Sequence, residues 1–147
     1  MSNIAVLKAE LAAGHPDTGA YSADAAMALA ELQAVNRTRL VAIPSTELLA
    51  WSASSGRYNS IKAAADDTSH AVNSVAAAAY LMITRDETSL DLNLADRVAF
   101  VDALVNGGVL TADDRTSLNT LATENISRET ELGLSGTKVG HILEARL

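Results

Sequence analysis

The sequence predicts an all-α fold, a compact single-domain bundle of about six to seven short helices. Apolar residues recur at three- and four-residue spacing, and no stretch shows the period-two alternation of strands. Glycine, proline and capping residues divide the chain into short segments. Because aromatic residues make up only 3% of the chain, its core must consist mainly of Ala, Leu, Val and Ile.

The N-terminal part predicts two helices joined by a turn. The first helix has its apolar residues on one face and ends at Gly14, where a C-capping glycine belongs. A proline and a glycine then interrupt the pattern, and Ser22 or Asp24 can cap a second helix that ends near Asn36. Residues 40–43, which precede a proline, are expected to form a connector or at most a short strand.

The middle of the chain predicts further helices. A short helix opens at Ser45, residues 57–65 can add another turn or two, and a longer helix begins near His70. The apolar run 71–83 spans 13 residues, against about 20 for a membrane span, and therefore indicates a buried core helix. Residues 85–91 are polar and predict a loop.

The last third predicts two helices and a hairpin. Residues 94–105 have a regular amphipathic pattern, and Thr111 with Asp114 has the form of a capping box for the next helix. Helical segments over 126–132 and near the C-terminus close the chain. We expect one domain over 1–147, with sub-units 1–43, an N-terminal helical hairpin, and 44–147, a helical core with a C-terminal hairpin.

Composition and motifs argue against an enzyme. The formal net charge of −7 disfavours a nucleic-acid partner held by phosphate contacts, and the absence of cysteine excludes disulfides, thiolate nucleophiles and cysteine-based zinc sites. The three histidines fall in three different segments of the chain, and there is no nucleophile elbow, phosphate loop or dinucleotide fingerprint. We expect no catalytic residues, no cofactor and no metal.

Polar, aromatic and basic residues are sparse in this alanine-rich chain, yet they gather at residues 14–21 and 36–39. Such residues on a loop between rigid elements are where recognition usually occurs. The alternative is a packed turn in which the tyrosine staples the first helix to the second, with solvated arginines beyond it. The predicted partner-binding residues are His15, Pro16, Asp17, Thr18, Tyr21, Asn36, Arg37 and Arg39.

The segment 126–146 resembles a helix-turn-helix with residues 132–134 as its turn. Glu129 stands where such motifs usually have a small buried residue, and Gly136 and Gly140 weaken the second helix. The alternative is a helical hairpin that packs on the core.

Three stretches carry a resemblance to a known group of proteins. Residues 14–21 (GHPDTGAY), 34–39 (AVNRTR) and the ending from ISRETELGL through GH to AR are similar to small, largely uncharacterised proteins of tailed bacteriophages and prophages. The resemblance covers the first forty and the last twenty residues, and the chain departs from it over 44–110. It implies a phage protein of virion or late-gene association, and no catalytic residues.

Together these observations predict a non-enzymatic, virion-associated structural or adaptor protein of a tailed phage. Its expected partners are other phage structural proteins of the tail, connector or fibre region, with multiple copies or a homo-oligomer, and no membrane. The second interpretation is a small phage regulatory or host-interfering protein that binds DNA through the C-terminal hairpin.

Overall fold

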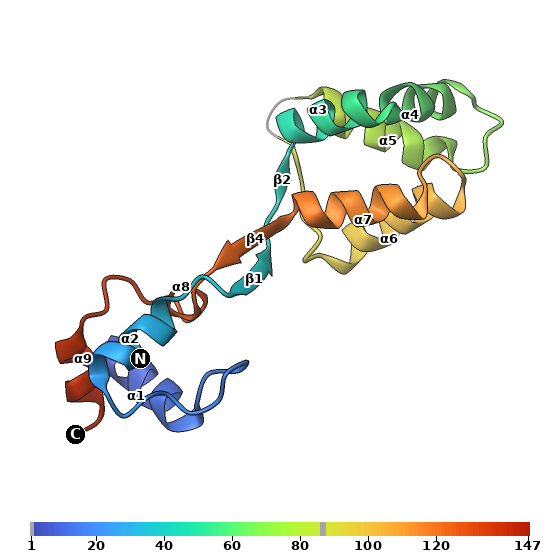
Figure 1. Ribbon diagram of the computed structural model, residues 1–147. Coiled ribbons are helices and arrows are strands. Elements are labelled where there is room, and N and C mark those ends of the chain that lie inside the picture. The colour runs from blue at the N-terminus through green and yellow to red at the C-terminus, as the bar shows by residue number, and fades with distance from the viewer. Residues whose placement is uncertain (1, 86–87) are drawn as a thin grey trace. The chain divides into compact units, whose positions relative to one another are not determined.

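The computed structural model describes residues 2–85 and 88–147, which are mostly helical (Figure 1). The chain forms two compact units: unit 1 consists of Met1–Arg39 and Asn125–Leu147, and unit 2 of Leu40–Glu124. This division differs from the expected sub-units 1–43 and 44–147, because the C-terminal segment packs with the N-terminal one. Local periodicity shows which face of a helix is buried but not which distant segment covers it.

Unit 1 is built from both ends of the chain. Helices α1 (Asn3–Ala13) and α2 (Ala25–Gln33) pack against α9 (Val139–Ala145), and the short α8 (Arg128–Glu131) packs against α2. Ser2 caps α1 and Asp24 caps α2 through side-chain oxygens that accept backbone N–H groups, and Gly14 ends α1 as predicted. The unit has its own core of buried residues, which includes Leu7, Ala28, Leu32, Leu134 and Ile142.

Unit 2 contains the helices α3 (Ser45–Ser55), α4 (Arg57–Asp66), α5 (Asn73–Thr84), α6 (Ala95–Asn106) and α7 (Ala112–Leu121). Helix α4 packs along α5, and α3 contacts both, while α6 contacts α5 and α7 (Figure 1). The predicted capping box of Thr111 and Asp114 is present at the start of α7. The separate core of this unit includes Leu48, Ile61, Ala76, Ile83, Leu104 and Leu118.

The fold is not purely α-helical as predicted, because four short strands form two strand pairs within the described residues. β1 (Arg37–Leu40) pairs with β4 (Thr123–Ile126), and β2 (Ile43–Pro44) pairs antiparallel with β3 (Ser89–Leu90). The sequence allowed a connector or a short strand over 40–43, and in the structure β1 ends at Leu40 and β2 begins at Ile43. Strands of two to four residues are too short to show a period of two, so the sequence pattern did not reveal the others. The longest of them carry β-branched threonines or isoleucine, which suit extended backbone.

The number and bounds of the helices also differ from the prediction. The described residues form nine helices, and α5 begins at Asn73 because turns occupy residues 68–72. The predicted helix over 126–132 is instead the end of β4 followed by the four-residue α8. Residues 86 and 87 of the predicted loop 85–91 lie outside the described residues.

The apolar run 71–83, which the sequence predicts to be a core helix rather than a membrane span, lies mostly in α5. Across the described residues, every helix is too short or too polar to cross a bilayer.

Candidate interaction surface

The loop of residues 14–21 closes on itself through its backbone. The N–H of His15 donates to the carbonyl of Gly19 at 2.8 Å, and the N–H of Gly19 donates back to the carbonyl of His15 at 2.9 Å. Gly14 has a φ of 90°, and a Cβ there would lie 3.2 Å from the backbone of Gly19. The tight turn therefore needs glycine at position 14, both for its φ and for the close approach of the two backbones.

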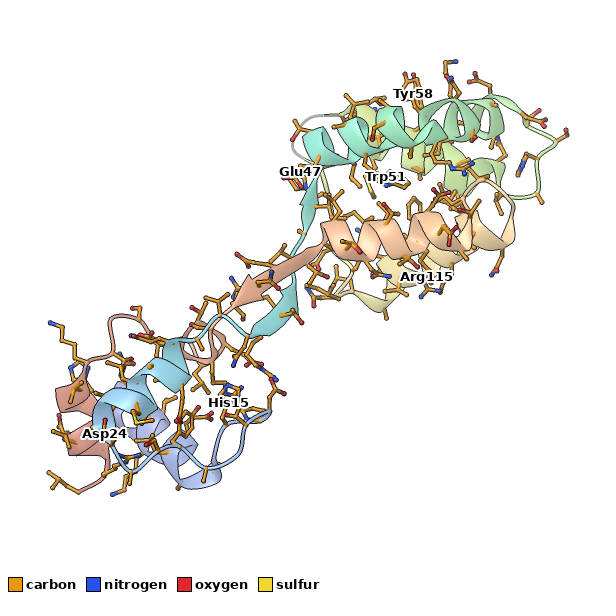
Figure 2. The ribbon with its side chains drawn as sticks, viewed as in Figure 1. His15, Asp24, Glu47, Trp51, Tyr58 and Arg115 are labelled. Carbon is orange, nitrogen blue, oxygen red and sulfur yellow. The ribbon has the colours of Figure 1, made fainter. Side chains whose placement is uncertain are left out.

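His15 holds this loop from the inside. Its side chain points from the loop into unit 1 and is only 3% exposed (Figure 2). Nδ1 accepts the backbone N–H groups of Asp17 and Thr18 at 3.1 and 3.3 Å, so in the neutral ring the proton belongs on Nε2. The ring also meets Tyr21 edge to face at 6.0 Å between centroids. The side chain of His15 thus holds the backbone of the exposed loop residues and is not itself available to a binding partner.

Tyr21 lies beside a buried ion pair. Its hydroxyl donates to Glu10 Oε1 at 2.8 Å, and Arg128 donates to both oxygens of the same carboxylate through Nε and Nη2 at 2.8 and 2.9 Å. The hydrogen bonds from Arg128 lower the pKa of Glu10, although burial opposes them. Burial, followed by the hydrogen bond to Glu10, raises the pKa of Tyr21. A carboxylate that is 5% exposed is tolerated here because three donors satisfy it.

Arg37 continues this arrangement. It donates through Nε and Nη2 to both oxygens of Glu131 at 2.8 and 3.1 Å, and through Nη1 to Asp17 at 2.8 Å. Arg128 Nη1 lies 2.9 Å from Glu131, and the hydrogen bonds from Arg37 and Arg128 lower the pKa of Glu131 to about 2. We call Glu10, Asp17, Arg37, Arg128 and Glu131 the ion-pair network. Within unit 1 it joins α1, the 14–21 loop, the start of β1 and α8.

The structure therefore brings together the two segments that the sequence predicts as partner-binding, but it does not expose all of their residues. His15 and Tyr21 are buried, and Arg37 is half-buried with its guanidinium bonded to two carboxylates. The predicted residues that remain exposed, called here the loop surface, are Pro16, Asp17, Thr18, Asn36 and Arg39.

A hollow of about 230 Å³ lies where the loop meets α2. Thr18 and Ala20 line it from the loop, and Glu31, Ala34 and Asn36 line it from α2 and the residues that follow. The N–H of Ser22 donates to Glu31 Oε2 at 3.1 Å, which holds the carboxylate in place. The hollow thus combines small apolar side chains with one carboxylate, one hydroxyl and one amide.

Sequence reasoning missed Glu10, Glu31, Arg128 and Glu131. One signal was available for Glu10, which lies three residues after Leu7 and therefore on the inward face of α1. A charged residue on a buried face needs a partner of opposite charge. The partner itself, 118 residues away, could not be found from local spacing.

The C-terminal segment forms two short helices that pack in unit 1. Helix α8 has four residues and α9 has seven, and Ile142 of α9 is buried in the core of the unit. Glu129 is also buried, and one of its carboxylate oxygens accepts the N–H of Thr137 at 2.8 Å. These contacts attach the C-terminal segment to the core of unit 1 through α1 and α2.

Comparisons of the chain with protein-family models, with curated proteins and with solved structures find no match. Among the described residues, no three His, Asp or Glu side chains converge as a metal site would require.

Proposed function

We propose that the protein is a non-enzymatic structural or adaptor protein of a tailed-phage virion, which binds other phage proteins of the tail, connector or fibre region. The observation that carries this proposal is which segments of the chain form unit 1. Its two chain segments, Met1–Arg39 and Asn125–Leu147, nearly coincide with the first forty and last twenty residues that resemble phage proteins. A single folded unit thus contains the whole resemblance, and the divergent middle of the chain falls in unit 2.

The chemistry of unit 1 supports a binding role. The loop surface is exposed, whereas the residues beneath it are fixed by hydrogen bonds, ion pairs and the Gly14–Gly19 approach. A loop whose backbone is already held in one conformation loses less conformational entropy on binding than a flexible loop. Repeated assemblies need such partner-specific surfaces rather than catalytic groups.

The test is mass spectrometry of purified virions of the phage that encodes this chain. A structural or adaptor protein is present in a fixed ratio to other virion proteins, whereas a regulator is absent. Absence of its peptides from virions would overturn the proposal.

A single substitution tests whether the loop surface is where the protein binds its partners. Thr18→Tyr fills the hollow beside the loop surface, and we expect it to reduce incorporation into virions about tenfold, which corresponds to about 1.4 kcal/mol of binding. Thr116→Tyr, at an exposed position of α7 in unit 2, is the matched control. Equal incorporation of both variants, with unchanged circular dichroism, would place the interface elsewhere.

A further inference from the structure

The hollow beside the loop has the chemistry of a cation-binding pocket. Glu31 uses Oε2 to accept the Ser22 N–H, and its half-buried carboxylate lines a space that is otherwise bordered by neutral side chains. Thr18 and Asn36 line the same hollow, and their side chains carry a hydroxyl and an amide oxygen that can accept hydrogen bonds. Oxygen acceptors around one carboxylate suit an incoming N–H donor that carries positive charge.

The charges around the hollow favour a cation as well. Arg37 lies next to Asn36 in the chain, but its guanidinium is bonded to Asp17 and Glu131. The ion-pair network contains three carboxylates and two guanidiniums, so it adds no net positive charge near the hollow. Arg146 also lies nearby, where its guanidinium donates to the carbonyls of Ser22 and Ala23 rather than to Glu31. The whole chain has a formal charge of −7. A partner with basic side chains is therefore attracted at long range, and one of its positive charges can pair with the carboxylate of Glu31.

The apolar part of the hollow can hold the stem of a long side chain. Ala20 and Ala34 line it. Met27 lies on the same side of α2 as Glu31, one turn earlier, and is 60% exposed. Basic side chains bury their methylene groups on such apolar surface while the charged end reaches a polar partner.

We propose that this hollow receives a lysine or arginine side chain of a partner protein, with Glu31 as its counter-ion. This inference names the chemistry of the partner at the loop surface of the proposed function. Its test uses the isolated full-length chain, so that the two proposals fail separately: absence from virions refutes the function, and the titration below refutes the pocket.

The experiment compares two small probes by two-dimensional NMR of the ¹⁵N-labelled protein. The probes are N-acetyl-lysine amide and N-acetyl-norleucine amide, which have similar stems but differ in charge. We expect the lysine probe to shift the backbone amides of Thr18, Ala20 and Asn36 and to bind at least about fivefold more tightly, with a millimolar dissociation constant that rises with salt. N-acetyl-arginine amide is expected to map to the same amides.

Two matched variants test whether the preference for the lysine probe over the norleucine probe comes from the carboxylate of Glu31. Glu31→Gln keeps an oxygen that can accept the Ser22 N–H but removes the charge, so the preference for lysine over norleucine should disappear. Glu144→Gln, an exposed glutamate of α9 outside the lining, should preserve the preference. Equal binding of the two probes to the wild-type protein, or shifts that map outside the hollow, would overturn the proposal without reference to any variant.

Discussion

At the residue scale, a few charged side chains decide how the ends of the chain meet. Glu10 and Arg128 are 5% and 17% exposed in their side chains, and both oxygens of Glu10 are bonded to Arg128. An ion pair taken out of water gains net stability only if its geometry is good and its remaining groups are bonded. The Tyr21 hydroxyl and Glu131 supply those further contacts. The pair thus meets the conditions under which a buried ion pair is tolerated.

Glu131 should stabilise unit 1 at neutral pH and lose this effect at acid pH. The folded pKa of Glu131 is lowered to about 2, against about 4.3 in an unfolded chain, so its contribution is fully present above about pH 5 and is lost as the pH falls toward 2. Glu131→Gln should lower the free energy of unfolding by about 1 kcal/mol at pH 7. The gap between wild type and variant should close between about pH 5 and pH 2. Thermal unfolding over this pH range measures it.

The matched control for this prediction is Glu144→Gln, which removes an exposed carboxylate from the same unit. Its melting temperature should stay close to that of the wild type at each pH. A gap between wild type and Glu131→Gln that does not change with pH would show that the ion-pair network does not lower the pKa of this carboxyl group.

At the element scale, the sequence predicted helices well wherever a cap and a periodic apolar face coincide. Asp24, Gly14 and the Thr111–Asp114 capping box are local signals, and the structure has each of them at a helix end. The strand pairing was not predicted because the partners lie far apart in the chain: Ile43 pairs with Leu90. In the candidate site, the turn at 14–21 was predictable and a packed Tyr21 was one of the two alternatives, but the burial of His15 was not predicted. The surroundings of Tyr21 depend on distant segments, because its hydroxyl bonds to Glu10 of α1, which Arg128 of α8 also binds.

The capping box of α7 offers a test of these local signals. The Thr111 hydroxyl accepts the N–H of Asp114 at 3.1 Å, and Asp114 accepts the N–H of Thr111 at 2.7 Å. Thr111→Ala should destabilise unit 2 by about 1 kcal/mol, because an N–H of the first turn loses its acceptor. Urea unfolding followed by the fluorescence of Trp51, which is labelled in Figure 2, measures the change. The indole Nε1 of this residue of α3 donates to the hydroxyl of Ser117 of α7 at 3.1 Å.

Thr120→Ala is the control for the cap. Thr120 is exposed on the same helix, and its hydroxyl bonds to the carbonyl one turn earlier, so alanine there should be neutral or slightly stabilising. Equal losses for the two variants would mean that the cap has no special value at this helix end.

At the scale of the whole molecule, the chain places one unit inside the sequence of the other. Unit 2 occupies Leu40–Glu124, between the two segments of unit 1, and each unit has its own buried core. The sequence did not predict this division, because composition and charge are even along the chain and the boundaries have no glycine- or proline-rich linker. The associations that define unit 1 are contacts between distant segments. Bonds such as that of Arg128 to Glu10 have no local signature.

Two units with separate cores should unfold in two distinguishable steps. Arg128→Met leaves the carboxylate of Glu10 buried without its counter-ion, so we expect unit 1 to lose about 3 kcal/mol. The single tryptophan, Trp51, belongs to unit 2, so its fluorescence transition in urea should stay within the error of wild type. Far-ultraviolet circular dichroism reports both units and should show an earlier first step. If Arg128→Met instead shifts the fluorescence and dichroism curves together, the molecule unfolds as one cooperative body, because a single two-state transition moves every probe by the same amount.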